Sequence, residues 1–92
     1  MKKAVSLYEI RTEQSDVTVS LPEKAELLGV HMTKWGAHIV ALSPRDNSDW
    51  VDWHFRWHRG DWATDLLSEN YVGSVVIGPS DEMMWHLFVV DN

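Results

Sequence analysis

The stretch WVDWHFRWHRGDW, residues 50 to 62, concentrates side chains that could do chemistry. Arg56 offers a fork of hydrogen-bond donors, and His54 and His58 can donate to a phosphate or stack on an aromatic ring. If the segment is a strand, its two-residue period places these three side chains on one face. The spacing predicts a candidate site for an anionic nucleotide, with a tryptophan available to stack on the base.

The same face could supply metal ligands. Alternate residues of a strand lie roughly 6 to 7 Å apart, so Asp52 and His54 could share one metal ion, whereas His54 and His58, about 13 Å apart, could not. A zinc site would need a further histidine from another strand, and three are available: His31, His38 and His86. The chain has no cysteine to complete such a set. We expect no metal and no cofactor.

Catalytic motifs are missing from the sequence. It contains no glycine-rich phosphate loop, no nucleophile elbow and no HExxH helix. Serine, histidine and aspartate are too frequent for a triad to be chosen from sequence. We therefore expect a protein that is not an enzyme.

The element that carries the 50–58 face could be a helix or a strand. Trp50, Trp53 and Trp57 have helical spacing, but on a helical wheel His54 and His58 fall inside the apolar arc. As a strand, the segment separates cleanly into two faces. The apolar face carries Val51, Trp53, Phe55 and Trp57, and the polar face carries Asp52, His54, Arg56 and His58. We predict a strand.

The six tryptophans divide into two expected groups. We expect Trp53, Trp57 and Trp85 to anchor the core, because each can bury on the order of 150 to 250 Å². The others lie beside the strand or in a presumed hairpin, and exposed tryptophan often marks a partner surface. The partner-binding residues predicted on this basis are Trp35, Trp50 and Trp62, with Arg59 and Asp61 as rim contacts.

The rest of the chain keeps a two-residue period. Apolar residues alternate or run together over 4–10, 17–21, 25–32, 37–42, 71–77 and 83–90, with turn residues between them. Gly36 can supply the positive φ of a hairpin between the third and fourth runs. Residues 63–70 read as a short helical turn. We predict one all-β domain over residues 1–92, an antiparallel barrel or sandwich of about seven short strands with one helical turn.

Composition narrows the environment and the partners. The chain has 92 residues, 45% of them hydrophobic, and its lack of cysteine is usual for a reducing cytoplasm. Neither a signal peptide nor a membrane-spanning run is expected. A net charge of −6 with eight scattered lysines and arginines argues against nucleic-acid binding. A DNA mimic is an alternative, but the carboxylates form small separate groups, which favours a solvated surface.

Several segments together resemble a family of small accessory proteins encoded by tailed bacteriophages. These are LPEKAELLGV at 21–30, HIVALSP at 38–44, YVGSVV at 71–76 and WHLFVV at 85–90. At residues 58–61 the chain has HRGD where such relatives tend to have a Thr-Gly turn. The resemblance implies a phage protein working in the infected bacterial cytoplasm, and the family has no assigned catalytic residues to transfer.

Three functional hypotheses follow. The leading one is a noncatalytic phage binding protein that antagonises a host defence or regulatory factor by protein contact, as a small homo-oligomer. The second is a binder that sequesters an anionic nucleotide signal through His54, Arg56 and His58. The third is a component of the virion or of its assembly. In none of them does the chain act on nucleic acid or at a membrane.

Overall fold

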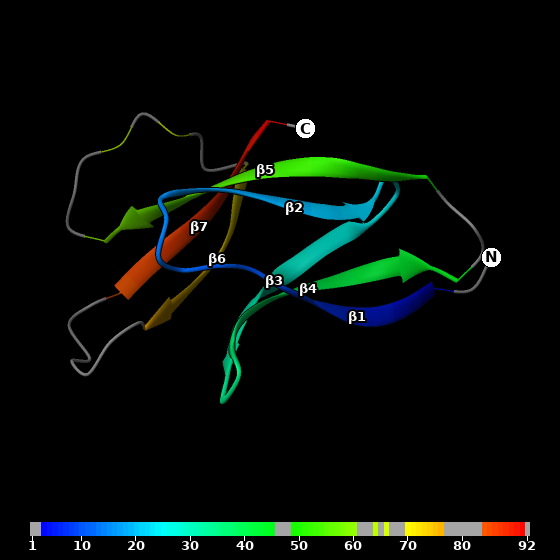
Figure 1. Ribbon diagram of the computed structural model, residues 1–92, viewed down its shortest axis with the longest axis horizontal. Coiled ribbons are helices and arrows are strands. Elements are labelled where there is room, and N and C mark those ends of the chain that lie inside the picture. The colour runs from blue at the N-terminus through cyan, green and yellow to red at the C-terminus, as the bar shows by residue number, and fades with distance from the viewer. Residues whose placement is uncertain are drawn as a thin grey trace.

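Figure 1 shows a computed structural model of the chain, which describes residues 3–45, 49–60, 64, 66, 70–76 and 84–91. It confirms the all-β prediction, with seven strands in two antiparallel sheets. The strands are β1 (Lys3–Glu9), β2 (Asp16–Pro22), β3 (Glu26–Thr33), β4 (Gly36–Pro44), β5 (Trp50–Arg59), β6 (Tyr71–Val76) and β7 (Met84–Asp91). The predicted helical turn at 63–70 lies mostly outside the described residues.

Each sheet combines strands from distant parts of the chain. The three-stranded sheet has the order β1-β4-β3, and the four-stranded sheet has the order β2-β5-β7-β6. The chain passes from one sheet to the other after β1, β2 and β4. As Figure 1 shows, β2 and β5 therefore lie beside one another although residues 23–49 separate them.

The hydrophobic core lies between the two sheets. The alternating pattern of β4 buries Ala37, Ile39, Ala41 and Ser43 on one face. The buried residues that form the core cluster are Ile10, Val17, Leu21, Ala37, Ile39, Trp53, Phe55, Trp57, Val75 and Leu87. Both sheets contribute, so each sheet has one inner face and one outer face.

β5 has the two faces that the sequence predicts. Trp53, Phe55 and Trp57 are buried, and Asp52 and His54 are exposed. The indole Nε1 of Trp57 donates a hydrogen bond to the carbonyl oxygen of Arg11 at 2.7 Å, which ties the β1–β2 loop to the core. Trp85 packs against the core but is only partly buried. Two of the three expected core tryptophans are thus buried, and the third lies at the margin.

A tight hairpin joins β3 to β4. Gly36 has a φ of 122°, which confirms the predicted positive φ at this position. The Thr33 hydroxyl donates to the Gly36 carbonyl and accepts from the amide of Trp35.

No helix in the described part of the chain is long and apolar enough to cross a membrane.

Candidate functional site

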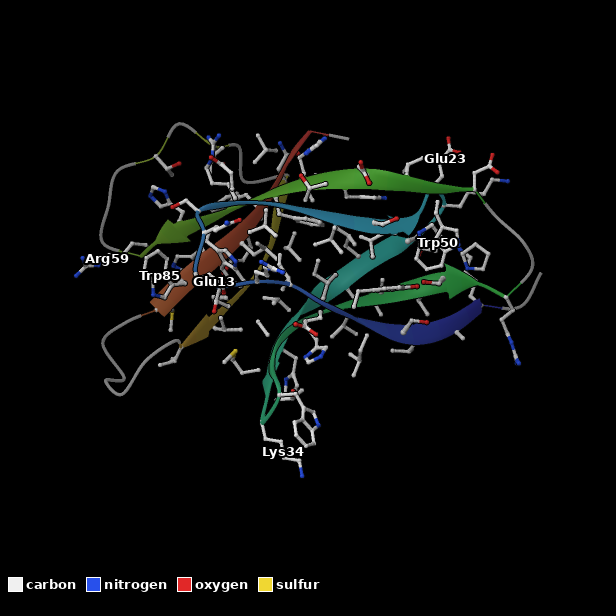
Figure 2. The ribbon with its side chains drawn as sticks, in the orientation of Figure 1. Glu13, Glu23, Lys34, Trp50, Arg59 and Trp85 are labelled. Atoms are coloured by element: carbon white, nitrogen blue, oxygen red, sulfur yellow. The ribbon has the colours of Figure 1, made fainter. Side chains whose placement is uncertain are left out.

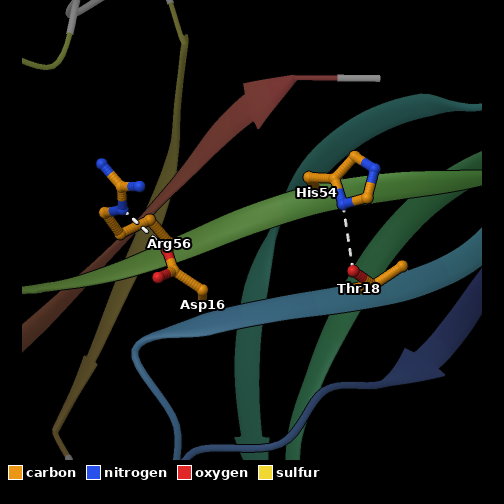
Figure 3. A network of polar contacts seen from close by, with 4 residues as sticks. All are labelled: Asp16, Thr18, His54 and Arg56. Carbon is orange, nitrogen blue, oxygen red and sulfur yellow. Dashed lines mark hydrogen bonds and ion pairs between the residues drawn. The ribbon is translucent and has the colours of Figure 1, made fainter.

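The outer face of the four-stranded sheet carries the predicted ligand residues. The β2–β5 register sets Arg56 opposite Asp16 and His54 opposite Thr18. Arg56 Nε donates to Asp16 Oδ1 at 2.8 Å, and Thr18 Oγ1 lies 3.0 Å from His54 Nδ1, as Figure 3 shows. All four side chains point away from the core, so the strand period places them on a surface.

A hollow of about 300 Å³ lies on this face. It is lined by Asp16, Val17, Thr18, His54, Phe55, Arg56 and Val90. His54 and Arg56 thus meet at one place, as the sequence predicts. His58 does not line this hollow, so the predicted trio is divided.

The charges at the hollow limit what it can bind. The Asp16 carboxylate carries a charge opposite to that of Arg56 and occupies its Nε. Both side chains are well exposed, so solvent screens the pair and the guanidinium terminal nitrogens can still donate. The arrangement can hold a small polar ligand, but the carboxylate opposes an anion.

His58 belongs instead to an aromatic cluster on the same outer face, formed with Tyr71, His86 and Phe88. The register sets His58 opposite His86 and Tyr71 opposite Phe88. The Tyr71 hydroxyl is 2.9 Å from His86 Nδ1, and the Tyr71 and Phe88 ring centroids are 5.3 Å apart. Phe88 is only 8% exposed although it lies outside the main core. The sequence signal for this cluster is the alternation of His86 with Phe88. This alternation does not predict the cluster until β6, which carries Tyr71, is known to pair with β7.

The histidines and carboxylates are the side chains of this protein that could bind a metal ion. Within the described ranges, no group of three or more such side chains is placed to hold a metal ion. His31 and His38 face one another across β3 and β4, in the other sheet from His54 and His86.

The predicted partner-binding residues occupy separate places. Trp35 is 76% exposed at the β3–β4 hairpin, with Lys34 Nζ 4.7 Å from its ring centroid. Trp50 is 58% exposed and meets Tyr8 edge to face. Figure 2 places Trp50 and Arg59 at opposite ends of the long axis and Lys34 at the hairpin tip, so these residues do not form one patch. Asp61 and Trp62 lie outside the described residues.

The outer face of the three-stranded sheet is apolar, which the alternating pattern of the sequence does not predict. Val5 and Leu7 of β1 are 64% and 55% exposed there, and the register sets them opposite Leu42 and Val40, which are half-buried. Leu28, 54% exposed, lies at a β-bulge of β3 beside this row. We call Val5, Leu7, Leu28, Val40 and Leu42 the apolar outer face.

Charged groups frame the apolar outer face. Lys3 Nζ pairs with the carboxylate of Glu26, and Glu9 lies opposite His38 at the far end of β1. The sequence carries a signal for this face, because AVSLYEI and HIVAL are apolar at consecutive positions and not only at alternate ones. Strands of that composition are typical of sheets covered on both sides.

No family model matches the chain, and neither a curated protein nor a solved structure matches it. The structure itself defines a two-sheet antiparallel protein with an apolar outer face on one sheet and a polar, histidine-rich outer face on the other.

Proposed function

We propose that this protein is a noncatalytic binding protein that acts by contact with another protein, and that the apolar outer face is its docking surface. One observation carries the proposal: Val5, Leu7 and Leu28 are each more than half exposed on one sheet. Exposed apolar side chains that lie together, with a charged rim, are the usual mark of a protein contact. The partner that fits is a protein with a flat apolar patch.

The identity of that partner rests on the sequence resemblance. A phage accessory protein would meet host factors in the infected cytoplasm, so the proposed partner is a host defence or regulatory protein that the contact inhibits. Inhibition by occupation needs no catalytic group, which agrees with a functional surface made of leucine and valine. Trp35 lies at the β3–β4 hairpin and Trp50 at the start of β5, so these exposed tryptophans would contact a partner at separate places and would not form the centre of the docking surface.

The test compares the host proteins captured by the tagged wild-type chain and by three variants of it. The double variant Leu28→Lys/Leu42→Thr changes the apolar outer face, and we expect it to fold, because Leu28 is exposed and threonine at the half-buried position 42 is a β-branched residue that suits a strand. We expect it to lose a stoichiometric host protein that the wild-type chain retains. The control, His54→Ala/Arg56→Ala/His58→Ala, alters the other sheet and should retain that protein.

Loss by the control and retention by the face variant would place the contact on the polar face. If both variants retain the host protein and only a further variant, Trp35→Ala/Trp50→Ala, loses it, the contact would lie at the tryptophans. Circular dichroism and thermal unfolding of each variant separate loss of contact from loss of fold.

A second function, sequestration of an anionic nucleotide, is favoured by one observation: His54 and Arg56 open on the same hollow. Because Asp16 opposes an anion there, Asp16→Asn should bind a nucleotide more tightly than wild type, by about threefold to fivefold for a change of up to 1 kcal/mol. Titration calorimetry with a panel of mono- and dinucleotides measures this. Absence of binding in both proteins would exclude the panel as ligands.

A further inference from the structure

Two strands of the described chain present an open lateral edge. β1 pairs only with β4, and β2 pairs only with β5. The other two terminal strands approach each other, because a Cβ added at Gly73 of β6 would lie 3.2 Å from the backbone nitrogen of Val30 in β3. An unpaired edge has free backbone donors and acceptors that can take another strand.

The hydrogen bonds identify which backbone groups of β1 are available. The amide of Ile10 donates to the carbonyl of Ala37, its directly opposite residue in the β1–β4 register. Hydrogen-bonded pairs recur every second residue, so Ala4, Ser6 and Tyr8 also bond to β4. Lys3, Val5, Leu7 and Glu9 therefore direct their amide and carbonyl groups toward the open edge. Their side chains lie on the outer face.

Three two-fold registers of β1 with a second copy set at least three of the residues Lys3, Val5, Leu7 and Glu9 of each strand opposite one another. Centring on Val5 sets Lys3 opposite Leu7, and centring on Leu7 sets Glu9 opposite Val5, so both bury a charge against an apolar side chain. Centring on Ser6 sets Lys3 opposite Glu9 and Val5 opposite Leu7. That register alone joins cation to anion and apolar to apolar along the whole strand.

The edge of β2 lacks this complementarity. The backbone amide of Trp57 donates to the carbonyl of Ser15, its opposite residue. The backbone groups of the alternate residues, Asp16, Thr18, Ser20 and Pro22, therefore face the open edge. Pro22 has no amide proton to donate. No cation lies on that edge to pair with Asp16, so a two-fold contact there gains nothing from charge.

We propose that two copies of this chain associate through β1, antiparallel and centred on Ser6, with Lys3 of each copy facing Glu9 of the other. The contact joins the three-stranded sheets into one six-stranded sheet. It is closed, because each copy uses its one complementary edge, so a dimer forms and not a fibre. The apolar outer faces of the two copies then become continuous.

Charge-swap variants test the partner and the register together. In K3E and in E9K each copy presents two like charges to the other, and we expect dimerisation at least about tenfold weaker than wild type in sedimentation velocity. An equimolar mixture of K3E and E9K restores both opposite pairs across the β1 contact and should form a heterodimer, although the K3E copy still lacks its internal Lys3–Glu26 ion pair. The control mixture, K34E with E13K, has the same net charges, and its substitutions lie outside β1.

Proline substitution tests the use of the backbone edge. Val5→Pro removes an amide that faces the open edge, so the chain should stay folded and become monomeric. Ser6→Pro removes an amide that bonds to β4 and should lower the thermal stability instead. Val5→Pro and Ser6→Pro are one position apart in β1, so they differ mainly in which edge of the strand loses its amide.

A wild-type chain that stays monomeric up to millimolar concentration overturns the proposal. So does a dimer that K3E and E9K leave unchanged, or a control mixture that associates as strongly as K3E with E9K. If Val5→Pro fails to fold, the mixing of K3E with E9K still tests whether β1 forms the dimer contact. The proposed dimer is independent of the proposed function, because K3E and E9K leave every residue of the apolar outer face unchanged.

Discussion

At the scale of single residues, two buried tryptophans of β5 differ in what their indole nitrogen meets. Trp57 Nε1 donates to the Arg11 carbonyl at 2.7 Å, whereas Trp53 Nε1 has no hydrogen-bond partner among the described residues. Replacement of either by phenylalanine removes a similar volume. Only Trp57→Phe also leaves a carbonyl without its donor, so the comparison isolates one hydrogen bond.

We expect Trp57→Phe to lower the free energy of unfolding by about 1 to 3 kcal/mol more than Trp53→Phe. Urea denaturation followed by far-ultraviolet circular dichroism measures the difference. Equal losses would mean that Arg11 finds another donor or that Trp53 Nε1 is hydrated.

At the scale of the elements, the two sheets approach each other closely where β3 passes β6. A Cβ at Gly73 would lie 3.1 Å from Val30 Cγ1, whereas at Gly29 the nearest atom would be the Val72 carbonyl oxygen at 4.0 Å. We expect Gly73→Ala to force the strands apart and cost about 1 to 3 kcal/mol. Gly29→Ala should be neutral or stabilise by up to about 1 kcal/mol, because alanine reduces the entropy of the unfolded chain.

Thermal unfolding of Gly73→Ala and Gly29→Ala checks this prediction. If both glycines tolerate alanine equally, the approach of β3 to β6 does not limit stability.

The elements also show how far the sequence can be interpreted without a structure. Alternation predicts the strands well, since the two faces of β5 depend only on its own residues. Pairing is different: Thr18 meets His54 and Tyr71 meets His86 through contacts between segments far apart in the chain. Those contacts divide the predicted ligand trio, and no local pattern encodes them. The sequence does not predict the apolar outer face, because consecutive apolar residues do not reveal which side of a strand another layer covers.

At the scale of the whole molecule, the single core predicts one cooperative unit. Ile39 of the three-stranded sheet and Phe55 of the four-stranded sheet belong to the same buried cluster. A chain of 92 residues has a total stability of about 5 to 14 kcal/mol, which leaves little for either sheet alone. Loss of packing in one sheet should therefore be felt throughout.

We expect Ile39→Val to lower the free energy of unfolding by about 0.5 to 1.5 kcal/mol and Phe55→Leu by about 0.5 to 3 kcal/mol. In each variant, both sheets should unfold at the same urea concentration, and that midpoint should be lower than in the wild-type chain. Tryptophan fluorescence reports mainly on the four-stranded sheet, which holds Trp50, Trp53, Trp57 and Trp85, and circular dichroism reports on both sheets. Coincident curves in each variant are the expected result. If Ile39→Val shifted the dichroism curve and left the fluorescence curve in place, the sheets would unfold separately.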